Sequence, residues 1–178
     1  VDQLALDVWS EHRGPGIPLV VVVAAADLAR LDAGGVAYTI VDADIDATAR
    51  AERDRIAAAP LAAGGDWFAE YRDYRAITAH VEQLAALAPE RASAHVIGVS
   101  LDQRPIVALR IGGADPATTP MLVNGTQHAR EWISSMVTTC VADRLVRDSD
   151  TYPKIRAFFD RTTFWVVPLA NPDGYQYS

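Results

Sequence analysis

The sequence has little cysteine, little lysine and no long hydrophobic run. Cys140 is the only cysteine, so no disulfide framework can form within the chain, and its apolar surroundings predict a small buried residue rather than a reactive thiol. No apolar run reaches the roughly 18 residues of a membrane span, and we expect none. Lys154 is the only lysine, the arginines are scattered, and the net charge is −7, which together argue against a nucleic-acid surface.

What the chain does have is the composition of a soluble, core-forming protein. Half of its 178 residues are hydrophobic and 22% are charged. A stretch of small residues at 57–66, AAAPLAAGGD, is typical of a linker and predicts two domains, 1–62 and 63–178. The chain begins at Val1 and stops soon after a turn signal, and we expect it to be truncated at both ends.

The first region has short strand and helix patterns. We predict strands at 4–9, 17–24 and 36–45, and helices at 25–33 and 46–59. The valine run of the second strand predicts a well-buried element. Gly34 and Gly35 are expected to end the first helix. A unit of this size buries little core by itself.

The second region alternates longer elements. An apolar stripe with a possible cap at Asp73 predicts a helix within 71–90, followed by a hairpin of strands at 94–100 and 104–112. Beyond it we predict strands at 121–125 and 162–170, helices at 130–148 and 152–160, and a turn at 171–174. This alternation predicts an α/β fold, with helices on the faces of the sheet.

The stretch 121–132, MLVNGTQHAREW, carries the strongest chemical signal. It places His128 and Glu131 three positions apart, where a strand gives way to a helix. Functional groups in α/β sheets gather at the carboxyl ends of strands, and this spacing lets both side chains reach one side of a tight turn. Imidazole nitrogen and carboxylate oxygen are zinc ligands, but a catalytic zinc needs a third. The pair alone also fits a polar helix cap.

Four stretches in order carry a resemblance to one family. NGTQHAREWIS resembles the His-x-Arg-Glu-Trp segment of zinc metallocarboxypeptidases of the carboxypeptidase A/B type. The helix at 73–90 with the hairpin IGVSLDQRPIVALRIGG looks like the first catalytic-domain helix and its Gly-x-Ser…Arg-Pro-Ile hairpin. FFDRTTFWVVPLANPDGYQYS is similar to the strand that leads to the family's Asn-Pro-Asp-Gly turn. Upstream, 6–53 is more loosely similar to the activation segment of family zymogens.

The resemblance implies an architecture and a site. Residues 63–178 would form the N-terminal half of a mixed-sheet zinc-exopeptidase domain with helices on both faces, preceded by a partial α+β propeptide-like domain at 1–62. His128 and Glu131 would be two of the three zinc ligands, and Arg130 would contact peptide substrate. The parent protein would be a secreted zymogen, activated by a protease, that hydrolyses the last peptide bond of peptides and proteins through a zinc-activated water.

The resemblance also sets limits. The third zinc ligand and the general base are expected downstream of Ser178, so the fragment itself should be inactive. Two alternatives stay open: a non-catalytic binding module on the same sheet, and a zinc hydrolase that acts on cell-wall peptides.

Overall fold

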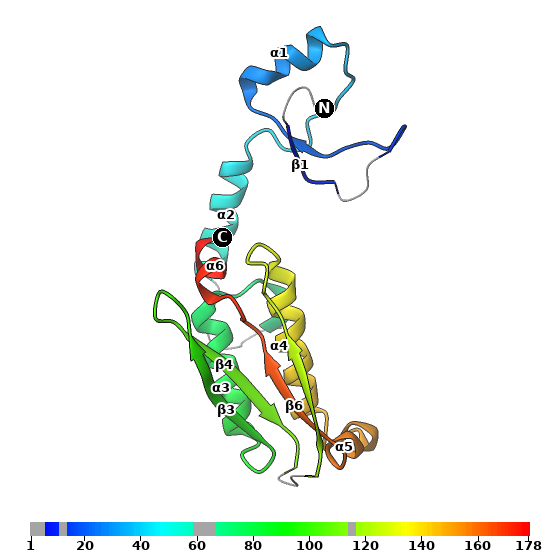
Figure 1. Ribbon diagram of the computed structural model, residues 1–178. Coiled ribbons are helices and arrows are strands. Elements are labelled where there is room, and N and C mark those ends of the chain that lie inside the picture. The colour runs from blue at the N-terminus through cyan, green and yellow to red at the C-terminus, as the bar shows by residue number, and fades with distance from the viewer. Residues whose placement is uncertain (1–5, 11–13, 59–66, 114–116) are drawn as a thin grey trace. The chain divides into compact units, whose positions relative to one another are not determined.

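The computed structural model describes residues 6–10, 14–58, 67–113 and 117–178 (Figure 1). The chain divides into two compact units, Val1–Ile45 and Asp46–Ser178. Most of the predicted linker, and with it the predicted domain boundary between 62 and 63, lies outside the described residues.

The first unit has less regular structure than its sequence predicts. Strand β1 (Asp7–Val8) pairs antiparallel with β2 (Val21–Val22), and helix α1 (Ala25–Ala33) ends at Gly34 as expected. The prediction of a well-buried strand at 17–24 is wrong, because only two of its residues are in a strand and Val20 is 54% exposed.

The third predicted strand of this unit is also wrong. Residues 36–44 contain no strand, and Val41 is 89% exposed. β-Branched residues favour a strand only where a neighbouring strand accepts the backbone hydrogen bonds. Helix α2 (Ile45–Ala58) forms as predicted, and none of its residues is buried.

The second unit holds the main sheet. Besides α2, which belongs to it from Asp46 on, its elements are η2 (Trp67–Ala69), α3 (Tyr74–Leu87), β3 (Ala92–Val99), β4 (Pro105–Ile111), β5 (Thr119–Asn124), α4 (Trp132–Arg147), α5 (Pro153–Phe159), β6 (Thr162–Val167) and α6 (Pro172–Tyr177). The strand order is β3-β4-β6-β5. β3 with β4 and β4 with β6 are antiparallel, whereas β5 runs parallel to β6 with Met121 opposite Phe164. The predicted mixed sheet is therefore confirmed.

Helices α3 and α4 pack side by side against one face of this sheet (Figure 1). The core between helices and sheet consists of buried apolar side chains from both layers: Val81, Leu84, Ala142, Val146, Leu109, Ile111, Phe164 and Val166. Helices on the second face remain a prediction. No helix in the described part of the chain is long and apolar enough to cross a membrane.

A buried polar contact joins the two long helices. His80 of α3 has its Nε2 atom 2.8 Å from Oδ2 of Asp143 on α4, and Arg147 Nε donates to the same oxygen at 2.9 Å. Burial raises the pKa of Asp143, but the hydrogen bonds with His80 and Arg147 outweigh it and hold this pKa below its ordinary value. Cys140, on the same helix, is partly exposed, so the expectation that it is buried is wrong.

A second apolar cluster lies where α6 meets α3 and α4. It contains Trp67, Ile77, Met136, Leu169 and Tyr175. The Tyr175 hydroxyl donates to the Arg72 carbonyl at 2.6 Å, and burial raises the pKa of this phenol. The end of the described chain is thus anchored to the segment just before α3.

Candidate metal centre

The candidate site lies on the loop that follows β5, beside the segment that follows β6. Gly125 donates its N–H to the Val167 carbonyl at 2.9 Å, and its own carbonyl accepts from Ala170 N at 3.1 Å. A side chain at Gly125 would collide with Thr138 Oγ1 and with the Ser134 carbonyl, 2.8 Å from the position of a Cβ atom. The two parallel strands therefore stay joined where the loop begins.

Thr126 turns the chain out of the sheet. It is fully buried and has a φ of 58°, in the left-handed region that a β-branched residue rarely adopts. Three partners hold it there: its N–H donates to Ser134 Oγ at 2.8 Å, its hydroxyl to the Pro168 carbonyl at 2.9 Å, and its carbonyl accepts from Asn171 N at 3.1 Å. Such strain costs about 1–3 kcal/mol and is typical of functional sites.

The turn brings the two predicted metal ligands together. His128 Nδ1 lies 3.1 Å from Glu131 Oε1, and the side chains are 77% and 54% exposed. The Glu131 N–H also donates to the His128 carbonyl at 3.1 Å. Glu131 is the residue before helix α4 rather than part of its first turn, and its side chain does not cap the helix. The polar-cap interpretation of the pair therefore loses its main support.

The donor chemistry fits zinc in part. A ring nitrogen and a carboxylate oxygen that already face each other can turn toward one cation, and both types of atom bind zinc. The described residues contain no group of three or more histidine, cysteine, aspartate or glutamate side chains placed to hold a metal. The described pair can therefore supply two ligands of a zinc site but not a complete protein ligand set.

Arg130 lies between the two predicted ligands in sequence. It is exposed, and within the described residues its guanidinium has no hydrogen bond or ion pair. An exposed guanidinium of this kind can bind a carbonyl or carboxylate oxygen.

The Asn-Pro-Asp-Gly stretch packs directly against this loop. It begins helix α6 and is not the simple turn that the sequence predicts: Asn171 caps the helix by accepting from Gly174 N at 3.0 Å, and Pro172 is in the first turn. Asn171 Nδ2 donates to the Gln127 carbonyl at 3.3 Å. A Cβ atom on Gly174 would lie 2.7 Å from Cβ of Ala129, so only glycine permits this close contact.

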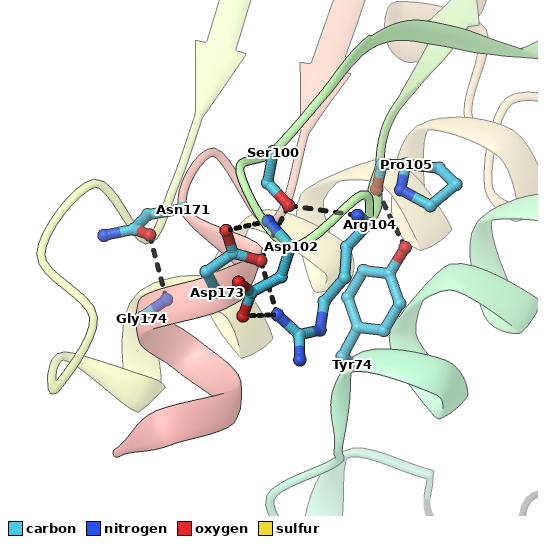
Figure 2. Close-up of polar contacts among 8 residues, drawn as sticks. All are labelled: Tyr74, Ser100, Asp102, Arg104, Pro105, Asn171, Asp173 and Gly174. Carbon is cyan, nitrogen blue, oxygen red and sulfur yellow. Dashed lines mark hydrogen bonds and ion pairs between the residues drawn. The ribbon is translucent and has the colours of Figure 1, made fainter.

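Asp173 links α6 to the β3–β4 turn, a contact that sequence reasoning missed (Figure 2). Its carboxylate accepts from Ser100 Oγ at 2.6 Å, from Asp102 N at 3.0 Å and from Arg104 Nη1 at 2.5 Å. The hydrogen bond from Ser100, followed by those from Asp102 and Arg104, holds the pKa of Asp173 below its ordinary value. Each stretch has a recognisable pattern in the sequence, but nothing local pairs residues about 70 positions apart.

A family model described as zinc carboxypeptidase matches residues 77–178. Carboxypeptidase B of Astacus astacus is 35% identical over 113 residues, which cover 64% of this chain and 36% of that protein. Carboxypeptidase A4 of Mus musculus is 27% identical over 184 residues, which cover 99% of this chain and 44% of that protein. The chain spans less than half the length of these relatives.

Solved structures agree with the fold. Carboxypeptidase A from Helicoverpa armigera superposes with a TM-score of 0.74 at 26% identity, covering 98% of this chain and 44% of that one. Thrombin activatable fibrinolysis inhibitor superposes with a TM-score of 0.78 at 20% identity, covering 97% of this chain and 45% of that one, a likeness of fold alone. Because the family model matches more than half of its residues, the chain belongs to the zinc carboxypeptidase family.

Proposed function

We propose that the whole protein is a zinc-dependent carboxypeptidase that hydrolyses the C-terminal peptide bond of peptides and proteins. The observation that carries the proposal is the His128–Glu131 pair, with its donor atoms 3.1 Å apart on an exposed loop at the ends of two parallel strands. The family membership of the chain supplies the reaction class.

In this proposal His128 and Glu131 are zinc ligands and Arg130 binds substrate. Zinc, when bound, activates a water for attack on the scissile carbonyl and polarises that carbonyl. The Arg130 guanidinium attracts the negative charge of a peptide chain end or the oxygen of its last carbonyl. The third ligand and the general base are assigned to residues outside those described.

The test is release of the C-terminal amino acid from unblocked peptides by the whole protein, followed by mass spectrometry. We expect His128→Ala and Glu131→Gln each to lower kcat/KM more than about 100-fold, because even the outer partners of metal ligands contribute 10–100-fold. His95→Ala is the matched control, since His95 is exposed but contacts Ser93 and Trp165 instead. Zinc binding by the whole protein without hydrolysis would favour a non-catalytic binding module.

The same proposal includes residues 1–62 as a propeptide-like segment, secretion of the parent, and an activating protease that cuts in or near α2. Its support is that Arg50, Arg53 and Arg55 are exposed on a helix with no buried residue. Mass spectrometry of the secreted protein would test this, and a mature chain that still contains residues 1–62 would contradict it.

A further inference from the structure

The Asp173 carboxylate is fully engaged by the β3–β4 turn. Three donors point at its two oxygens, from the Ser100 hydroxyl, the Asp102 backbone and the Arg104 guanidinium (Figure 2). With both oxygens taken and a cation beside it, this carboxylate is not the missing metal ligand. Its contacts serve to fix the first turn of α6 in place.

The turn that holds Asp173 is itself well fixed. Ser100 N donates to the Arg104 carbonyl at 2.9 Å, and Arg104 N donates to Ser100 Oγ at 3.0 Å. The Tyr74 hydroxyl donates to the Pro105 carbonyl at 2.8 Å, which joins the end of the turn to helix α3 (Figure 2). The hydroxyl of Ser100 thus accepts from its own turn while it donates to α6.

Residues on both sides of Asp173 in the sequence contact the loop that carries His128. Its neighbour Gly174 packs against Ala129, and Asn171, two residues earlier, donates to the Gln127 carbonyl at 3.3 Å. These two contacts lie immediately before and immediately after His128. A shift of the first turn of α6 would therefore move the loop on both sides of that ligand.

We propose that Asp173 is a positioning residue, which holds the His128–Glu131 pair in a metal-binding arrangement by locking α6 to the β3–β4 turn. The inference rests on the proposed function, because it takes His128 and Glu131 to be metal ligands. Ser100 and Arg104 are the partners through which it acts.

The first arm of the test uses the full 178-residue chain without metal. Amide hydrogen exchange at Asn171 and Glu131 is expected to accelerate by about ten-fold or more in Asp173→Asn and in Ser100→Ala. The Asn171 N–H donates to the Thr126 carbonyl and the Glu131 N–H to the His128 carbonyl, so both report on the loop. Asp150→Asn is the matched control, since that carboxylate also joins two arginines, but beyond the far end of α4. Unchanged exchange in both variants would overturn the inference and leave the proposed function standing.

The second arm titrates the same chains with Zn²⁺ and follows the imidazole resonances of His128 by NMR. Asp173→Asn is expected to weaken the apparent Zn²⁺ affinity about ten-fold, at the low end of the effect of outer partners of metal ligands, whereas Asp150→Asn leaves it unchanged. Equal Zn²⁺ affinity in the wild type, in Asp173→Asn and in Ser100→Ala would overturn the inference. Absence of any His128 response in the wild-type chain would instead overturn the metal assignment itself, and the inference with it.

Discussion

Two small residues at the end of β5 determine the path of the site loop. Gly125 leaves no room for a side chain because Thr138 and the Ser134 carbonyl lie against it, and Thr126 adopts a left-handed conformation that its three hydrogen bonds maintain. Strain of this kind persists only where the surroundings impose it. The position of His128 thus depends on the packing beneath the loop.

Gly125→Ala is expected to lower the free energy of unfolding by about 1–3 kcal/mol, because the new methyl group overlaps a backbone carbonyl that cannot move aside cheaply. Gly98→Ala is the matched control: its methyl group would be 3.9 Å from Ile106 Cδ1, an ordinary contact, and the change should stay within about 0.5 kcal/mol. Urea unfolding followed by circular dichroism measures both. Equal stabilities of the two variants would contradict the close packing at Gly125.

At the scale of elements, helices α3 and α4 are joined by a buried polar group as well as by their apolar faces. His80 and Arg147 both contact Asp143, and the His80 ring stacks on Trp67 with centroids 4.1 Å apart. A carboxylate with two such partners, in a largely apolar interface, fixes the alignment of the helices. Removal of one partner leaves the others without compensation.

Asp143→Asn is expected to cost about 2–3 kcal/mol of unfolding free energy, as for the loss of buried hydrogen bonds to a charged group. Asp150→Asn removes a carboxylate that is itself 59% exposed and pairs with Arg91 and Arg156, and it should cost less than about 1 kcal/mol. Chemical denaturation compares the two variants at neutral pH. A loss for Asp150→Asn as large as that for Asp143→Asn would refute the special role of the buried group.

The contribution of the Asp143 carboxylate to stability should also depend on pH. The pKa of Asp143 is lower in the folded chain than its ordinary value of 3.8, so the unfolded chain takes up its proton first. The stability that this carboxylate contributes is complete above pH 3.8 and is lost as the pH falls through the lower folded pKa. We expect unfolding free energy to decline below pH 3.8 in the wild type and less steeply in Asp143→Asn. An unchanged slope in the variant would assign the acid sensitivity to other carboxylates, Asp173 among them.

Local signals explain which elements were predictable. Asp73 caps α3 by accepting from Ala76 N at 2.7 Å, as its place before an apolar stripe indicated, and the β3–β4 hairpin forms as expected. The prediction of a simple turn at 171–174 is wrong, because the stretch begins α6, and Pro172 after a capping Asn171 is also typical of a helix start. The prediction of a well-buried strand at the valine run before α1 is wrong, because strand propensity does not supply a partner strand.

The candidate site likewise has some features that the local sequence predicts and others that it does not. The spacing of His128 and Glu131 is local, and the structure places the two side chains in contact, while their role in metal binding remains a prediction. The contact of Ser100 with Asp173 spans 73 positions, and the left-handed Thr126 depends on Pro168, which follows β6, and on Ser134 of α4. Such features follow from the assembled sheet, and no short stretch of sequence encodes them.

At the scale of the whole molecule, helices α3 and α4 contribute to the apolar clusters, whereas α2 has no buried residue. Trypsin is expected to cut first at Arg50, Arg53 or Arg55 of α2, because a helix with no buried residue opens at little cost. Arg144 is the internal control: its side chain is 67% exposed against 57% for Arg55, but it belongs to the packed helix α4. Timed digestion with mass spectrometry would contradict this if Arg144 were cut as early as α2.

The mixed sheet also bears on the order in which the molecule assembles. β3 and β4 are neighbours along the chain and close through a short turn, whereas β5 meets its parallel partner β6 only after α4 and α5 have been traversed. Non-local pairings of this kind form late, since the intervening loop must close first. During synthesis the ribosome therefore exposes His128 well before β6 and α6 emerge to shape its loop. Under the proposed function, capture of a metal ion by His128 and Glu131 in their native arrangement would be a closing event of folding and not its trigger.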